Sequence, residues 1–100
     1  MRTEGEPRSP LRVLLVEDNA AEAFLLRESI GRVPNPPEVL HAESLDRALD
    51  CLGRTRVDAV LLDLELPDSG GLETLDRVYA AADSVPIVIL TGREDDELGV

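Results

Sequence analysis

The stretch VDAVLLDLELPDSGG (residues 57–71) carries the strongest structural signal in the chain. Its first six residues, 57–62, form an apolar run that is typical of a strand buried on both faces of a sheet. The run ends at Asp63 and is followed by a loop that contains Pro67 and two glycines. Because the loop delays any following helix, Asp63 is less readily explained as the cap of a helix than an acidic residue directly before one.

The same strand pattern recurs on both sides of this stretch. Apolar runs predict further strands at 11–16 and 85–90, and residues 38–42 are a short strand candidate after the break at 34–37. Apolar residues at helical spacing indicate a helix from 19 that ends near 31–34, helices at 44–53 and 72–79, and another helix start from Glu94. Strands that alternate with helices predict parallel pairing through right-handed crossovers. We therefore expect a doubly wound α/β sheet over residues 11–100, preceded by a disordered leader at residues 1–10.

Capping residues mark the first two helix starts. Asn19 is expected to cap the first helix, with Glu22 reaching back to it as in a capping box, and Ser44 is expected to cap the second helix. The apolar face of the first helix is predicted from residues spaced by three and four, namely Ala23, Leu26, Ile30 and Val33.

The composition limits the partners of the chain. There are 21 acidic residues against 10 basic residues, all of them arginine, so the formal charge is −11. This acidity argues against binding to nucleic acid or to an anionic membrane surface. Residues 1–10 are too polar for a secretory signal, and no apolar run approaches the ~20 residues of a membrane span. The single cysteine, Cys51, fits a reducing, cytoplasmic location.

Residues with reactive or metal-binding side chains follow three of the predicted strands. Glu17 and Asp18 follow the first strand, Asp63 follows the third, and Thr91 with Gly92 follows the fourth. Since parallel strands end at one edge of a sheet, where open α/β proteins bind ligands, we expect these residues to converge. Clustered carboxylates repel unless a cation intervenes, and oxygen ligands favour a hard cation such as Mg²⁺. An aspartate beside such an ion can act as a nucleophile toward a phosphoryl group.

Some of these residues also have a purely structural interpretation. Asp18 alone is equally well explained as a helix N-cap, and Thr91 alone as a cap or turn residue. The combination is what indicates a phosphoryl site, in which Thr91 would donate a hydrogen bond and Gly92 would leave room for the phosphoryl oxygens.

Three motifs resemble those of the receiver domain of bacterial two-component response regulators. They are LLVEDN (14–19), LLDLELPDSGGLE (61–73) and VPIVILTG (85–92). Asp63 is followed by proline four residues later and by glycine eight residues later, as in that family. The resemblance covers residues 11–100 and implies a flavodoxin-like sheet of order 2-1-3-4-5, with the first and third strands side by side.

The resemblance implies a role for each matching residue. Asp63 would be the phosphoacceptor, taking a phosphoryl group from a histidine kinase or phosphotransfer protein. Asp18 would bind Mg²⁺ directly, Glu17 through water and Glu65 through its backbone carbonyl, and Thr91 would be the switch hydroxyl. Such a domain is no enzyme beyond catalysing its own phosphorylation and dephosphorylation, and it is commonly joined to an output domain.

Two residues near the site are candidates for tuning the lifetime of the phosphoryl group. Glu65 and Arg93 carry opposite charges on neighbouring loops, and Arg93 with Gly92 would line the site. We hypothesise that Glu65 and Arg93 approach each other and slow attack of water on the aspartyl phosphate. The alternative is two independently solvated side chains, and the dephosphorylation rate of Arg93→Ala distinguishes the two cases.

The sequence departs from the family pattern at its C-terminal end. It stops inside the predicted fourth helix, so the fifth strand, the last helix, the aromatic switch residue and the family's phosphoryl-binding lysine are missing, and none of the 100 residues is a lysine. The simplest account is a fragment of a longer protein. We expect a crippled phosphorylation switch, and a sheet of order 2-1-3-4 whose exposed edge at residues 85–90 would allow homodimer formation.

Two other classes of protein, a phosphatase and a flavin-binding protein, do not match this sequence. A phosphatase of the haloacid dehalogenase type needs its Asp-x-Asp motif after the first strand, whereas Asp63 follows the third. A flavodoxin needs a phosphate-binding loop after the first strand, where Glu17 and Asp18 would repel phosphate. The remaining alternative is a pseudo-receiver that keeps the fold, has lost phosphotransfer and acts as a protein-interaction module.

Overall fold

The computed structural model describes residues 11–90, in which four strands alternate with three helices. The elements are β1 (Arg12–Val16), α1 (Ala20–Gly31), β2 (Glu38–Ala42), α2 (Leu45–Arg54), β3 (Ala59–Asp63), α3 (Gly71–Ala82) and β4 (Ile87–Leu90). The predicted order of elements is confirmed over this range. The leader at residues 1–10 and the helix start from Glu94 lie outside the described residues.

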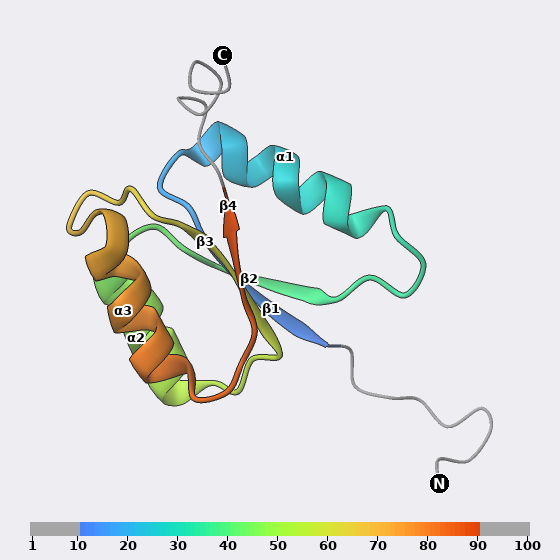
Figure 1. The fold of residues 1–100 in the computed structure, drawn as a ribbon. Helices are drawn as coiled ribbons and strands as arrows, with labels where there is room; N and C mark the ends of the chain where they lie inside the picture. Colours follow the sequence, from blue (N-terminus) through green and yellow to red (C-terminus); the bar gives the residue numbers. More distant parts are fainter. Residues whose placement is uncertain (1–10, 91–100) are drawn as a thin grey trace, which may run out of the picture.

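The four strands form one parallel sheet in the order β2-β1-β3-β4, as predicted (Figure 1). In the register of this sheet, Val16 at the end of β1 lies opposite Ala42 on one side and Leu62 on the other. The residue that follows Val16 and the residue that follows Leu62 are therefore brought to the same edge of the sheet.

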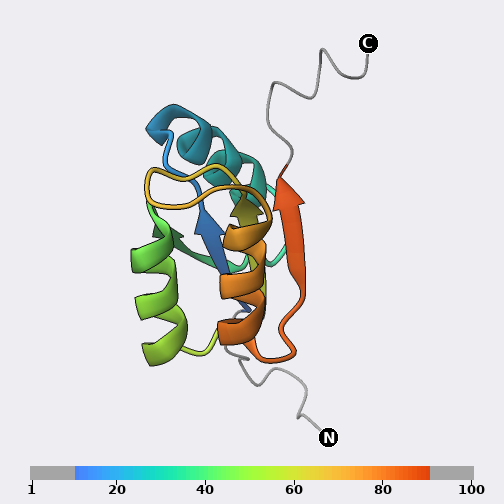
Figure 2. The ribbon, with the colours of Figure 1, turned by 60° about the vertical axis from the view of Figure 1, so that its left-hand side comes forward.

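Helices cover both faces of the sheet. The helices α2 and α3 lie side by side on one face and α1 lies on the other (Figure 1, Figure 2). The main hydrophobic cluster is formed by strand residues that point toward α2 and α3 and by residues of those helices and adjoining loops: Leu14, Val16, Ala42, Leu45, Ala48, Val57, Val60, Leu62, Leu66 and Val78. Leu15 alternates to the other face and is also fully buried, so β1 is buried on both faces as predicted.

The predicted caps of α1 and α2 are observed, with one difference. The side chain of Asn19 accepts a hydrogen bond from the Glu22 backbone N–H (2.9 Å), and Ser44 accepts one from Arg47 (3.2 Å). The reciprocal half of the capping box is wrong, because the Asn19 N–H donates to Glu17 Oε2 (3.0 Å). The carboxylate that satisfies the Asn19 N–H thus comes from the preceding strand end.

The apolar face predicted for α1 is only partly buried. Ala23 is buried, but Val33 lies beyond the end of the helix and is 46% exposed. Phe24 and Leu25 are both exposed. The spacing nevertheless located the inward side of α1, because Ala23, Leu26 and Ile30 are the only residues of this helix that are not exposed, and only the inclusion of Val33 was wrong.

The strand β4 starts at Ile87, two residues later than predicted. The turn after α3 places Asp83 and Ser84 at positive φ (40° and 72°), and the Pro86 carbonyl accepts a hydrogen bond from the Val60 N–H (3.0 Å). Pro86 has no N–H with which to extend the ladder, so regular pairing begins with the next residue. Within residues 11–90, β4 pairs with β3 alone and forms an edge of the sheet.

Among the helices described between residues 11 and 90, none has the length and apolar character required to cross a bilayer.

Candidate functional site

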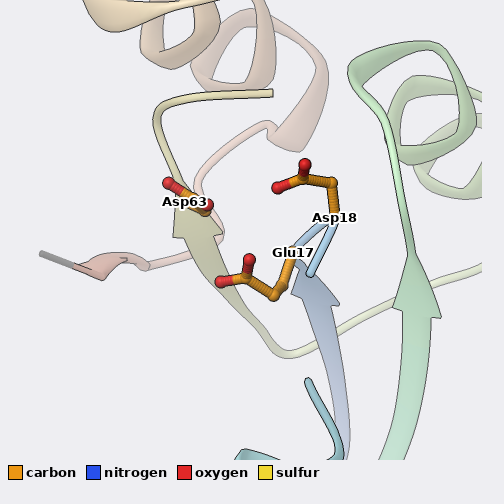
Figure 3. Close-up of side chains that lie close together, drawn as sticks. All are labelled: Glu17, Asp18 and Asp63. Carbon is orange, nitrogen blue, oxygen red and sulfur yellow. The ribbon is translucent and has the colours of Figure 1, made fainter. Parts of the chain in front are cut away.

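Three carboxylates meet at the C-terminal edge of the two central strands. Glu17 and Asp18 directly follow β1, and Asp63 is the last residue of β3. Each of the three offers an oxygen atom within 4.8 Å of the others. Figure 3 shows the three side chains converging on the space between the two strand ends. The predicted convergence is therefore observed for these three residues, and it follows from the pairing of Val16 with Leu62.

The three carboxylates differ in their exposure to solvent. Glu17 and Asp63 are buried (5% and 6% exposed), whereas Asp18 is exposed. The N-cap of α1 is Asn19, so the interpretation of Asp18 as a helix cap does not hold. The carboxylate of Asp18 therefore lies on the solvent-exposed side of the site, which we call its mouth, and those of Glu17 and Asp63 lie on its buried side.

Glu17 is held in place by residues at the start of α1 and at the end of β2. Its Oε2 accepts the Asn19 N–H at the start of α1 (3.0 Å), and its own N–H donates to the Ala42 carbonyl at the end of β2 (3.0 Å). Its carbonyl oxygen accepts a hydrogen bond from Nε2 of His41 (2.8 Å), which must carry the proton because a carbonyl can only accept. No local pattern in the sequence reveals this contact of His41.

The electrostatics of the site favour a bound cation. Burial raises the pKa of Glu17 above its ordinary value, and the neighbouring charge of Asp63 raises it further, while the hydrogen bond from the Asn19 backbone lowers it. Two buried carboxylates and an exposed one repel each other when all are ionised. A divalent cation among them relieves that repulsion, and a donor set of oxygen atoms suits Mg²⁺ or Ca²⁺.

The loop between β3 and α3 is held by backbone and side-chain hydrogen bonds, one of which involves Asp63. The Glu65 N–H donates to Asp63 Oδ1 (3.0 Å), while the Glu65 side chain is exposed. The Leu64 carbonyl accepts two hydrogen bonds, one from the Gly71 N–H and one from Thr74 Oγ1 (both 3.0 Å). Gly71 adopts a φ of 61°, which explains the glycine at this position.

Thr74 is a supporting residue that the sequence analysis missed. It is fully buried on α3, and its hydroxyl also lies 2.7 Å from the hydroxyl of Ser69. Since the Thr74 proton goes to the Leu64 carbonyl, Ser69 donates to Thr74. The only signal in the sequence is a threonine among the apolar positions of a helix, which is weak evidence for a loop anchor.

Three predicted site residues, Thr91, Gly92 and Arg93, lie outside the described residues. The hypothesis that Glu65 approaches Arg93 therefore stays a prediction.

Comparison with known proteins agrees with this arrangement. The family model of the response regulator receiver domain matches residues 13–100. The chain is 36% identical over 85 residues to the response regulator MprA of Mycobacterium sp. (strain KMS). This match covers 85% of the chain and 36% of that protein, so the chain spans about a third of the length of this relative.

Solved structures of response regulators have the same fold. The MaeR response regulator bound to beryllium trifluoride gives a TM-score of 0.75 at 22% identity, over 90% of this chain and 78% of that one. The phosphorylated cyanobacterial phytochrome response regulator RcpA gives a TM-score of 0.73 at 30% identity, over 89% of this chain and 71% of that one.

Proposed function

Since the chain belongs to the response regulator receiver domain family, we propose that Asp63 accepts a phosphoryl group from the phosphohistidine of a kinase or a phosphotransfer protein. The observation that carries this proposal is the cluster of Glu17, Asp18 and Asp63 within 4.8 Å at the ends of two adjacent strands. The similarity to RcpA, which was solved in phosphorylated form, supports it.

The surroundings of Asp63 suit a nucleophilic carboxylate. The Glu65 N–H occupies Oδ1 (3.0 Å), which leaves Oδ2 to attack phosphorus. The new P–O bond forms as the P–N bond to histidine breaks, and the electron pair of that bond stays on the imidazole nitrogen, which takes up a proton. Asp63 is only 6% exposed, so the product anhydride would be shielded from bulk water.

The residues present also fit a divalent metal ion. Asp18 and Asp63 would hold Mg²⁺ directly, Glu17 through a water molecule, and Glu65 through its backbone carbonyl. Bound there, Mg²⁺ neutralises negative charge on the transferred phosphoryl group. The pKa of Glu17, raised mainly by burial and further by the charge of Asp63, supports this assignment, because a cation among the carboxylates would offset both effects.

The partners follow from the same proposal. A phosphohistidine donor must reach the mouth of the site at Asp18, and an output domain in the parent protein would read the phosphorylated state. The curated relative MprA is about three times as long as the matched segment, which is consistent with a further domain there. A second copy of the chain would pair at the β4 edge.

Labelling by a small phosphodonor tests the proposal. We expect the chain to gain one phosphoryl group from acetyl phosphate in the presence of Mg²⁺, detected by intact-mass spectrometry, and to gain none with EDTA. Asp63→Asn should abolish the label. The matched control Asp76→Asn removes an exposed aspartate of α3 and should leave the label unchanged. A label that survives in Asp63→Asn would contradict the proposal.

A pseudo-receiver acting as an interaction module is the second candidate. The observation that favours it is the apolar surface of α1, where Phe24 is 61% and Leu25 63% exposed, since exposed apolar patches mark interaction surfaces. No label on the wild-type chain after prolonged incubation, with the fold intact by circular dichroism, would favour this alternative over phosphotransfer.

A further inference from the structure

Asp68 joins the loop that follows Asp63 to a helix distant in sequence. Its Oδ1 accepts the backbone N–H of Leu45 (2.8 Å) and its Oδ2 accepts that of Asp46 (2.9 Å). Both donors lie in the first turn of α2, where the backbone N–H groups have no partner within the helix. One carboxylate therefore caps a helix that begins 23 residues earlier in the chain. In Figure 2 the loop, drawn in yellow, passes over the N-terminal end of α2.

Asp68 sits in a hydrogen-bonded turn of this loop. Leu66 and Ser69 exchange two backbone hydrogen bonds (2.8 and 3.3 Å), so Pro67 and Asp68 form the tip of a tight turn. Leu66 is buried in the main hydrophobic cluster. A displacement of Asp68 would therefore move the whole turn rather than one side chain.

Hydrogen bonds also connect this turn to the residues beside Asp63 in the carboxylate site. Ser69 is held by Thr74, which also binds the carbonyl of Leu64, the residue next to Asp63. Glu65, between this anchor and the turn, donates its N–H to Asp63 Oδ1. The loop thus has one anchor on α3, through Thr74, and one on α2, through Asp68.

The contact between Asp68 and α2 is charge-assisted. A carboxylate at a helix N-terminus interacts favourably with the helix dipole, and its two oxygens match the two free N–H groups. The backbone hydrogen bonds from Leu45 and Asp46 lower the pKa of Asp68. Ser44 caps a different N–H of the same turn, that of Arg47, so Asp68 is not needed merely to start the helix.

We propose that Asp68 is a positioning residue for the carboxylate site, which fixes the β3–α3 loop against α2 and thereby places the Glu65 backbone beside Asp63. The proposal rests on the function proposed above, because Glu65 matters through its backbone carbonyl toward the metal ion and its N–H toward the phosphoacceptor.

Two substitutions at Asp68 and one matched control test the proposal. Asp68→Ala removes both acceptors, Asp68→Asn keeps one, and Ser44→Ala removes a cap of the same helix without touching the loop. The affinity for Mg²⁺ is measured by isothermal titration calorimetry on the full chain, and amide hydrogen exchange is followed by NMR. Asp18→Asn, which changes a proposed metal ligand, controls for binding at the site.

We expect Asp68→Ala to weaken Mg²⁺ binding about tenfold, as for other residues that support metal ligands, and Asp68→Asn to lie between it and wild type. Ser44→Ala should leave the affinity unchanged. The melting temperature should fall by about 4–8 °C in Asp68→Ala and in Ser44→Ala, because each loses a helix cap. Protection of the Glu65 amide should fall in Asp68→Ala alone.

The outcomes separate the two proposals. If Asp68→Ala and Ser44→Ala have the same Mg²⁺ affinity and the Glu65 amide is unaffected in both, Asp68 is only a helix cap and the positioning role is wrong. If neither wild type nor Asp18→Asn binds Mg²⁺ but Asp68→Ala still exposes the Glu65 amide, the loop anchor stands and the proposed function fails.

Discussion

The two faces of the sheet differ in how completely they are packed. On the face covered by α2 and α3, Val60, Leu62 and Val78 are fully buried. On the opposite face α1 leaves Phe24 61% and Leu25 63% exposed. The comparison indicates that the α2–α3 face holds the larger part of the buried apolar core of residues 11–90. The same face anchors the β3–α3 loop. Apolar side chains remain exposed on α1, at Phe24 and Leu25, and on the edge strand β4, at Val88 and Ile89.

The largest expected effect is the loss of stability when a buried leucine of the α2–α3 face is truncated, compared with the same truncation of an exposed leucine on α1. Leu62→Ala should lower the free energy of unfolding by about 2–5 kcal/mol, because it leaves a cavity in the main cluster. Leu25→Ala on α1 should change it by less than ~0.5 kcal/mol. Urea unfolding followed by circular dichroism measures both. Equal losses would show that the α1 face contributes as much as the α2–α3 face.

The loop anchor on the α2–α3 face should have a smaller effect. Thr74→Val keeps the shape of the side chain but leaves the Leu64 carbonyl and the Ser69 hydroxyl without their partner, so we expect a loss of about 1–3 kcal/mol. Tyr79→Phe, on the exposed surface of the same helix, is the control and should be neutral. A neutral Thr74→Val would mean that Gly71 holds the Leu64 carbonyl by itself.

At the carboxylate site, where the two faces meet, stability should depend on pH. The pKa of Glu17 is raised by burial and by the charge of Asp63. A carboxyl with a raised folded-state pKa favours folding below its unfolded pKa, and this contribution is lost as the pH rises through the folded value. Glu17→Gln should therefore melt higher than wild type at about pH 7 without Mg²⁺, and the difference should vanish at about pH 4.

Saturating Mg²⁺ provides the control for this comparison. It should stabilise wild type more than Glu17→Gln and so reduce or reverse the difference at neutral pH. A Glu17→Gln chain that is less stable than wild type in EDTA at neutral pH would contradict the repulsion inferred for the site.

The smallest effect on stability is expected at the β4 edge. Val88 is 51% exposed, so Val88→Lys should change the free energy of unfolding by less than ~0.5 kcal/mol. A charge on an edge strand opposes pairing with another strand, so this variant should self-associate less than wild type in light scattering over a concentration series. Leu72→Lys, exposed on α3 and away from the edge, is the control. A wild type that stays monomeric throughout would rule out pairing at β4.

Local sequence patterns predicted much of this molecule correctly. Apolar runs located β1, β3 and β4, and the proline-rich break located the start of β2. Asn19 and Ser44 marked two helix starts, and the residues after β1 and β3 marked the carboxylate cluster. These predictions succeeded because burial of a strand and capping of a helix depend on neighbouring residues. On α1 the spacing identified the least exposed residues, Ala23, Leu26 and Ile30, but it wrongly included Val33, which lies beyond the end of the helix.

The sequence by itself determined the order of elements, the parallel sheet and the three carboxylates at one edge, because alternating strands and helices leave few arrangements. Only the tertiary structure decided how the site is supported. The contacts from His41 to Glu17, from Thr74 to Leu64 and from Asp68 to α2 join residues 10 to 24 positions apart. Hydrogen bonds of this kind depend on where whole elements pack, and no local spacing encodes them. Asn19 shows the same limit, since its N–H binds Glu17 rather than the expected Glu22.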